Sequence, residues 1–233
     1  MKLLLEAIGL SLVRRLAPLD LGCSNGEMIA LVGANGSGKT SLLRALARVP
    51  GAGGTVRIDG EEIDRAAEVR RRQLLAFLPA SREVAWPISV RDIIELGLAG
   101  RDDGRVDRML ATFALEGLRD RTIGTLSTGE RSRALLARAM VAEPRLLLLD
   151  EPLANLDPYW TLRTLELLRL AARGDAAVMI ALHDLAQVDK FDRLLLLKEG
   201  RLLADGTPKQ LRDQLGALFR VEAGANGWRI RRD

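Results

Sequence analysis

Short runs of hydrophobic residues alternate along the chain with longer segments that have helical periodicity. The runs of four or five consecutive apolar residues lie at 28–32, 146–149, 178–182 and 194–197. Such runs are typical of strands that are buried on both faces of a sheet. Segments of helix length lie among them at 41–48, 131–142 and 161–173. This alternation predicts an α/β fold with a mostly parallel sheet and right-handed crossovers.

The N-terminal part of the chain follows a different pattern. Residues 1–15 begin with a lysine and several leucines, as a signal peptide does, but Glu6 interrupts the apolar stretch and no small-residue cleavage site follows. We expect two short strands there instead. In residues 55–60, Val56 and Ile58 alternate with charged residues, as in a half-exposed antiparallel strand. The pattern therefore predicts an N-terminal antiparallel β layer beside the parallel core.

A helical segment interrupts the strand pattern between about residues 81 and 126. Its apolar residues recur at helical spacing, with a polar break at 101–105, and it contains no strand-like run. We therefore expect a single domain over residues 1–233, with residues 81–126 as a helical subdomain inserted into the core.

Composition and charge narrow the class of protein. The chain is 48% hydrophobic and 28% charged, which is ordinary for a globular domain. Its 35 basic and 31 acidic residues are mixed along the sequence, so we expect no nucleic-acid partner. The three consecutive arginines at 70–72 follow Glu68 on an expected helix, and we interpret this run as a solvated helix face. Cys23 is the single cysteine and excludes an internal disulfide. No apolar run reaches the ~18 residues of a membrane span, so at a membrane another chain would supply the spans.

A glycine-rich loop directly follows the first buried strand and begins a helix. Its residues are Gly33, Ala34, Asn35, Gly36, Ser37, Gly38, Lys39 and Thr40, followed by Ser41. Glycines allow a tight loop whose N–H groups point inward, and the positive end of the helix dipole lies at the same place. The pattern is that of a phosphate-binding P-loop, in which Lys39 reaches the β- and γ-phosphates and Thr40 coordinates Mg²⁺.

Two carboxylates, Asp150 and Glu151, follow the buried run 146–149. The carboxyl ends of parallel strands form the edge at which open α/β sheets bind ligands. Because successive strand side chains point to opposite faces, we expect a division of roles. Asp150 is placed to hold Mg²⁺ through water, and Glu151 is placed to polarise an attacking water molecule. An acidic surface turn after a core strand is the alternative interpretation.

A third motif, Leu-Ser-Thr-Gly-Glu at 126–130, precedes the expected helix 131–142. Ser127 with Glu130 three residues later forms a capping box, which explains the motif locally without any function. The order of the motifs points further: the P-loop, this motif, Asp150-Glu151, Asn-Leu-Asp at 155–157 and then His183. In that order they resemble the ATP-binding subunit of ABC transporters, and the resemblance covers essentially the whole chain.

The resemblance implies a P-loop ABC-type ATPase with ATP and Mg²⁺ as cofactors. It identifies residues 33–40 as the Walker A loop, Asp150 as the Walker B aspartate and Glu151 as the catalytic glutamate. His183 matches the switch histidine, which is thought to contact the γ-phosphate and the attacking water.

The remaining motifs match positions that act across a dimer. Ser127, Thr128, Gly129 and Glu130 match the signature, which in such proteins contacts the γ-phosphate of ATP bound to the opposite subunit. Asp157 ends the matching D-loop, which crosses the dimer interface. A helix N-terminus at Ser127 is an anion site that its own chain need not fill.

The resemblance also implies partners. Two copies arranged head to tail about a two-fold axis, or one copy paired with a second ATPase subunit, would enclose two ATP molecules. Transmembrane permease subunits and a solute-binding protein would complete the system, with this chain at the cytoplasmic face of the inner membrane. The single nucleotide-binding unit fits a bacterial importer built from separate polypeptides. Within that group, the compact first hairpin without an aromatic residue and the short ending at 215–221 are similar to the ATPases of iron-siderophore, haem and cobalamin uptake. An ATPase of an exporter or lipid-transport system, or a soluble ABC ATPase without a transport role, remains as an alternative.

Three positions depart from the family pattern. Ala80 occupies the place of a glutamine whose amide normally touches Mg²⁺. No aromatic residue occurs at 11–16, where adenine is commonly stacked, so either Arg14 or Arg15 stacks its guanidinium there, or both are exposed turn residues. Thr128 replaces the first glycine of the signature, which keeps its backbone donors.

Overall fold

The N-terminal layer is an antiparallel sheet with strand order β2-β1-β4-β5. The computed structural model describes residues 3–84, 86–219, 221–224 and 227–230. The strands of this sheet are β1 (Leu3–Leu12), β2 (Leu16–Ser24), β4 (Ala52–Ile58) and β5 (Glu61–Glu62). The expectation of two short strands in residues 1–15 is wrong. One long strand, β1, pairs with both β2 and β4, because Gly9 adopts φ +60° and lets the strand shift register between Ala7 and Leu10 without ending.

The core is a six-stranded sheet with the order β10-β9-β3-β8-β7-β6. Its strands are β3 (Met28–Val32), β6 (Leu75–Leu78), β7 (Leu146–Asp150), β8 (Ala177–Ala181), β9 (Arg193–Lys198) and β10 (Arg201–Gly206). All neighbouring pairs are parallel except β9 and β10. The predicted fold class, a mostly parallel sheet with an antiparallel layer, is therefore confirmed.

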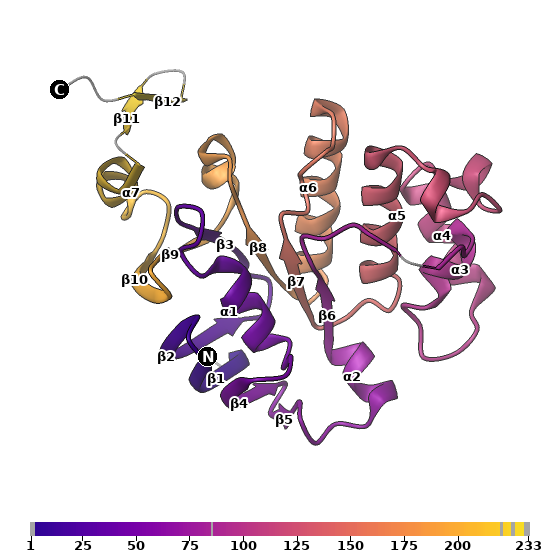
Figure 1. Ribbon diagram of the computed structural model, residues 1–233, viewed down its shortest axis with the longest axis horizontal. Coiled ribbons are helices and arrows are strands. Elements are labelled where there is room, and N and C mark those ends of the chain that lie inside the picture. Colours follow the sequence, from indigo (N-terminus) through magenta and orange to yellow (C-terminus); the bar gives the residue numbers. More distant parts are fainter. Residues whose placement is uncertain (1–2, 85, 220, 225–226, 231–233) are drawn as a thin grey trace.

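Two apolar clusters lie on the opposite faces of this sheet. Along β3, Met28, Ala30 and Val32 join one cluster, whereas Ile29 and Leu31 join the other. The second cluster also contains α1 (Lys39–Leu46) and the buried face of the antiparallel sheet, so α1 is packed between the two sheets (Figure 1). Burial on both faces explains why the core strands are continuously apolar in sequence.

The other helices cover the first cluster and the ends of the sheet (Figure 1). The α-helices are α2 (Glu68–Leu74), α3 (Val90–Glu95), α4 (Asp103–Thr112), α5 (Thr128–Met140), α6 (Pro158–Arg173) and α7 (Arg212–Phe219). Short 3₁₀ turns are η1 (Glu116–Leu118), η2 (Ile123–Thr125) and η3 (Leu185–Lys190), and β11 (Val221–Gly224) pairs with β12 (Gly227–Ile230). Among the described residues, no helix is both long and apolar enough to cross a membrane.

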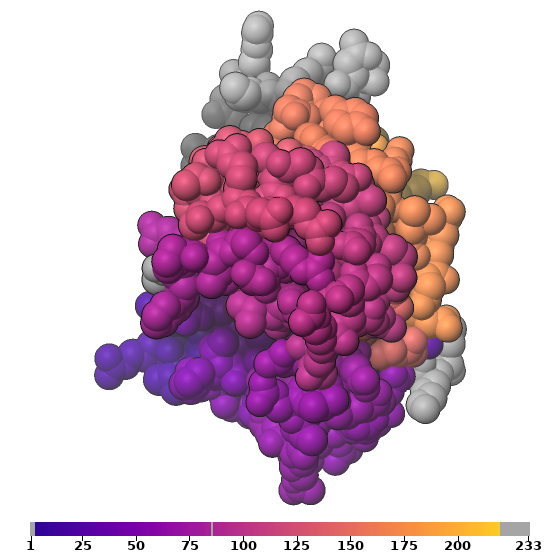
Figure 2. Space-filling view, turned by 90° about the vertical axis from the view of Figure 1, so that its right-hand side faces the viewer, coloured from indigo at the N-terminus to yellow at the C-terminus, as the bar shows by residue number. Residues whose placement is uncertain are grey.

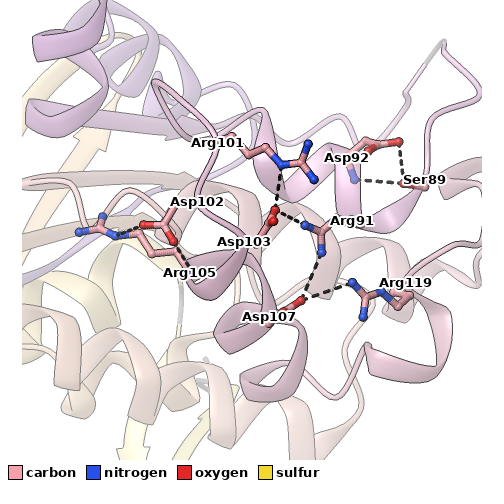
Figure 3. Close-up of polar contacts among 9 residues, drawn as sticks. All are labelled: Ser89, Arg91, Asp92, Arg101, Asp102, Asp103, Arg105, Asp107 and Arg119. Atoms are coloured by element: carbon pink, nitrogen blue, oxygen red, sulfur yellow. Dashed lines mark hydrogen bonds and ion pairs between the residues drawn. The ribbon is translucent and has the colours of Figure 1, made fainter.

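Ion pairs hold the outer helices of the segment 81–126 together (Figure 3). Arg91 on α3 contacts Asp103 and lies 3.3 Å from Asp107 on α4, and its side chain is only 17% exposed. Arg119 lies 3.5 Å from the same Asp107 carboxylate. On the inner side the apolar residues of α3 and α4 pack in the first cluster. The segment is thus joined internally by both kinds of contact.

The basic run at 70–72 lies on α2, as predicted. Arg70 pairs with Glu61 and Arg72 pairs with Glu68, while Arg71 donates to the carbonyl of Ala47. Each guanidinium therefore has a partner in its own chain, as expected of a solvated helix face.

Candidate nucleotide-binding site

A pocket of about 910 Å³ lies where β3, β7 and β8 end. The described residues that line it are Arg14, Arg15, Leu16, Ala17, Asn35, Gly36, Ser37, Gly38, Lys39, Thr40, Ser41, Glu151, His183, Glu199, Gly200 and Arg201. Three motifs that are far apart in the sequence, the P-loop, Glu151 and His183, thus meet at one edge of the sheet. This is the edge that open α/β sheets use for ligands.

Backbone contacts fix the P-loop tightly against the sheet. A Cβ atom on Gly33 would lie 2.3 Å from the carbonyl oxygen of Leu197, so only glycine fits there. Gly38, directly before α1, has φ +108°, which favours glycine as well. The amide of Ser37 donates to Ala34 (3.0 Å), and the Ser37 carbonyl accepts from Gly200 (2.9 Å). Gly33 and Ser37 are buried, and residues 34–36 between them are exposed.

Lys39 lies under this loop as the first residue of α1. Its ammonium donates to the carbonyls of Gly33 (2.7 Å) and Ala34 (3.2 Å), and the side chain is buried. Burial lowers the pKa of Lys39, and the nearby carboxylates of Glu151 and Asp150 act in the opposite direction. Lys39 thus lies beside the N-terminus of a helix, a position that suits a bound phosphate.

Asp150 is the last residue of β7 and is only 1% exposed. Burial raises the pKa of its carboxyl. The nearby Thr40 hydroxyl acts in the opposite direction, although it does not complete a hydrogen bond of normal geometry, and the negative charge of Glu151 raises the pKa further. Among the described residues neither carboxylate oxygen has a hydrogen-bond partner. A buried, unpaired carboxylate is costly unless a cation binds it, so Asp150 with the Thr40 hydroxyl fits Mg²⁺, which takes oxygen ligands.

Glu151 and His183 form a pair inside the pocket. Nε2 of His183 lies 2.6 Å from Oε1 of Glu151. At this distance the two groups share a hydrogen bond, in which Nε2 is the donor to an ionised carboxylate. Both side chains remain accessible, at 33% exposed for Glu151 and 47% for His183. Glu151 has φ +52°, a strained conformation for a residue with a side chain, and such strain is concentrated at functional sites.

The signature residues lie apart from this pocket in the single chain. Ser127 caps α5: its hydroxyl accepts from the amide of Glu130 (3.3 Å), and its own amide donates to the Glu130 carboxylate (2.8 Å). The capping box is therefore present. Ser127 and Thr128 are exposed, and a Cβ on Gly129 would lie 3.2 Å from the carbonyl of Asn155.

Asp157 also lies outside the pocket. It caps α6 by accepting from the amide of Trp160 (2.8 Å), and it is exposed. The two exposed motifs, residues 127–130 and 155–157, thus adjoin each other on one surface, at the N-termini of α5 and α6.

Sequence reasoning missed one arginine at the site. Arg82 lies in the loop between β6 and α3, and its Nη2 donates to the carbonyls of Asp150 (3.1 Å) and Glu151 (3.0 Å). The only signal in the sequence was its position two residues after Ala80. Arg14 and Arg15 both line the pocket, and none of its described lining residues is aromatic.

Comparison with known proteins agrees with this arrangement. The sequence model described as ABC transporter matches residues 16–154. The chain belongs to the ABC transporter family. It is an ATP-binding subunit of the ABC type and an ATPase, and ATP is its nucleotide.

Relatives of this ABC protein serve import systems. It is 37% identical over 206 residues to the hemin import ATP-binding protein of Jannaschia sp. (strain CCS1), covering 83% of this chain and 76% of that protein. It is 36% identical over 199 residues to the petrobactin import ATP-binding protein of Bacillus anthracis, covering 80% and 73%. The cobalamin import ATP-binding protein of Halobacterium salinarum (strain ATCC 29341 / DSM 671 / R1) is 34% identical over 217 residues, or 87% of this chain and 54% of that protein. The chain thus spans about half the length of the cobalamin relative.

A solved structure of an ATP-binding subunit of an ABC transporter superposes with a TM-score of 0.81 at 26% identity, covering 92% of this chain and 94% of that one. The dimeric post-hydrolysis structure of the ATP-binding cassette MJ0796, bound to ADP and phosphate, has a TM-score of 0.77 at 21% identity, covering 87% and 98%, and shares the fold.

Proposed function

We propose that this chain powers a bacterial ABC importer of iron-siderophore, haem or cobalamin by hydrolysing ATP. The observation that carries the ATPase role is the pocket in which Lys39, Glu151 and His183 meet. The import role is supported by the names of the hemin, petrobactin and cobalamin relatives.

In this proposal the chain's own groups divide the work. The P-loop amides and the Lys39 ammonium bind the phosphates of ATP, and Glu151 takes a proton from the attacking water. His183, which holds the Glu151 carboxylate in the structure, orients it toward that water. Asp150 and Thr40 would hold Mg²⁺, which neutralises charge on the transferred phosphoryl group.

The active assembly in this proposal is a dimer, formed by two copies or with a second ATPase subunit. The capped N-terminus of α5 presents amides and the Ser127 hydroxyl on an exposed surface outside the chain's own pocket. A head-to-tail arrangement about a two-fold axis would place this surface on the partner's ATP, with Asp157 near the interface.

The helical subdomain would face the permease. We divide the chain as one ABC ATP-binding domain, residues 1–233, with residues 81–126 inserted as the helical subdomain. Figure 2 shows this subdomain in magenta and pink, above the purple part that contains β4, β5 and α2. A groove of about 280 Å³ lies between β6 and this subdomain and contains Arg72, Leu96 and Arg138. Burial lowers the pKa of Arg138, and the neighbouring Arg72 adds to the effect. The groove therefore suits a cytoplasmic permease segment that offers apolar and acidic groups. A solute-binding protein would complete the system, and the chain would lie at the cytoplasmic face of the inner membrane.

Replacing the proposed base tests the ATPase mechanism. In Glu151→Gln, ATP binding should persist while phosphate release falls by at least about 10²-fold, since a positioned base contributes that much. The bound ATP should hold the variant as a dimer, which light scattering would show with ATP but not with ADP. Turnover near that of the wild type would reject the assignment.

Purification tests the transport role. Expressed from its native host with an affinity tag, the chain should co-purify with a polytopic permease, and an Arg138→Glu variant should lose that permease while keeping ATP binding. Recovery of the same permease with both proteins would reject the groove as its docking site.

A further inference from the structure

Arg82 joins the loop after β6 to the end of the neighbouring strand β7. Its Nη2 donates to two successive carbonyls, those of Asp150 (3.1 Å) and Glu151 (3.0 Å), and its Nη1 donates to the carbonyl of Pro79. The side chain is partly buried, and its Nε has no hydrogen-bond partner among the described residues. One guanidinium therefore connects its own loop with the segment that carries the two carboxylates.

The conformation of that segment explains why such a contact matters. Glu151 is held at φ +52°, and a strained residue keeps such a conformation only when surrounding contacts determine it. The two carbonyls that Arg82 binds belong to the peptide groups on either side of Glu151. Fixing both carbonyls thus fixes the direction in which the Glu151 side chain leaves the backbone, toward His183 at 2.6 Å.

Charge supports the same role. Burial lowers the pKa of Arg82, and the nearby carboxylates of Asp150 and Glu151 oppose that shift. The guanidinium therefore lies close to both carboxylates, and the attraction between opposite charges helps to keep Arg82 against this segment.

The rest of the loop offers no substitute for this contact. Ala80 has only a methyl group and cannot donate a hydrogen bond. Ser81 accepts from the amide of Glu83 within the loop (3.4 Å). In the described part of the loop, residues 79–84, Arg82 is the residue whose side chain reaches the Asp150–Glu151 backbone.

We propose that Arg82 is a positioning residue for ATP hydrolysis, which holds the Asp150–Glu151 backbone so that the Glu151 carboxylate points at the attacking water. The inference rests on the proposed function, since it assigns a role within that same site. Arg82 acts through Glu151 and does not itself touch the nucleotide.

The test compares variants of the full-length chain by kcat and KM for MgATP, by equilibrium ATP affinity and by thermal denaturation. Arg82→Met removes every side-chain donor and keeps an unbranched, flexible side chain that is shorter by the guanidinium group. Arg82→Lys keeps the charge and can reach one carbonyl. Arg48→Met is the matched control, because Arg48 also donates to a backbone carbonyl, Gly53 at 3.1 Å, and is largely buried, but it lies in neither the pocket nor the catalytic segment.

We expect kcat of Arg82→Met to fall at least tenfold while KM and the ATP dissociation constant change less than threefold. Arg82→Lys should recover part of the lost kcat. Arg48→Met should lower the melting temperature and leave kcat within twofold of the wild type.

Two results would overturn the inference. One is a kcat within twofold of the wild type in Arg82→Met. The other is a loss in Arg82→Met that follows ATP affinity or melting temperature and is equally large in Arg48→Met. If the wild type does not hydrolyse ATP, or if Glu151→Gln hydrolyses it as fast as the wild type, the proposed function fails and this inference fails with it. If the wild type hydrolyses ATP, Glu151→Gln does not, and kcat of Arg82→Met equals that of the wild type, the inference alone is rejected.

Discussion

Gly33→Ala is the smallest change that should disable the nucleotide pocket. The added Cβ would lie 2.3 Å from the carbonyl oxygen of Leu197 and 2.5 Å from Oγ of Ser37, whereas an ordinary carbon–oxygen contact is about 3.3 Å or longer. The P-loop must therefore move by about 1 Å away from β9. Overpacking of this kind costs about 1–3 kcal/mol, and a displacement of about 1 Å at a reacting centre costs on the order of 10²-fold in rate.

ATP turnover and unfolding by urea would be measured together on Gly33→Ala and two control variants. Gly54→Ala places a Cβ 2.4 Å from the carbonyl of Gly9 in the antiparallel sheet, so it should lose stability but keep ATP turnover per folded molecule. Gly117→Ala meets nothing within 4 Å and should change neither quantity. Turnover of Gly33→Ala within threefold of the wild type would refute the argument, because the loop would then have absorbed the methyl group without moving its amides.

Three further outcomes follow from the structure. Lys39→Ala should lose ATP binding, since it removes the buried ammonium beneath the loop; an unchanged ATP dissociation constant in a fluorescence titration would contradict this. Ser127→Ala should lower the free energy of unfolding by about 1 kcal/mol through loss of the α5 cap, and Ser127→Asp should restore it, as urea titration would show. Cys23 is fully buried, and burial raises its pKa to about 12, so its thiol is neutral at any pH well below that value. It should therefore resist iodoacetamide at pH 8 until urea unfolds the chain, and fast labelling of the native protein would contradict this.

The sequence predicted the parts of the fold in which local and tertiary preferences agree. The run 28–32 is buried on both sides of a parallel sheet, so its continuous apolar pattern indicated a core strand, and the structure has β3 over those residues. The helix starts are placed less well. The segment expected from 131 begins at Thr128, and the segment expected from 161 begins at Pro158, because caps at Ser127 and Asp157 extend both helices by a turn.

Other features could not be predicted because they depend on contacts between distant residues. Residues 1–15 contain turn-forming and charged residues that favour two strands locally, yet pairing with both β2 and β4 keeps β1 continuous through Gly9. Arg82 gave no local signal, since its partners are backbone carbonyls 68 and 69 residues away. Backbone carbonyls exist at every position and carry no residue-type pattern.

The sequence by itself determined the chemistry that this chain carries: a P-loop, a strand that ends in two carboxylates, a capped helix motif and one histidine, in an order that a known family shares. It did so because phosphate cradles, buried strands and helix caps each demand particular residue types at fixed spacing. Only the tertiary structure decided that Glu151 faces His183, that the buried Asp150 carboxylate has no hydrogen-bond partner within the described parts of the chain, and that the signature lies outside the chain's own pocket. These are relations between side chains from different strands, and the packing of the sheet sets them.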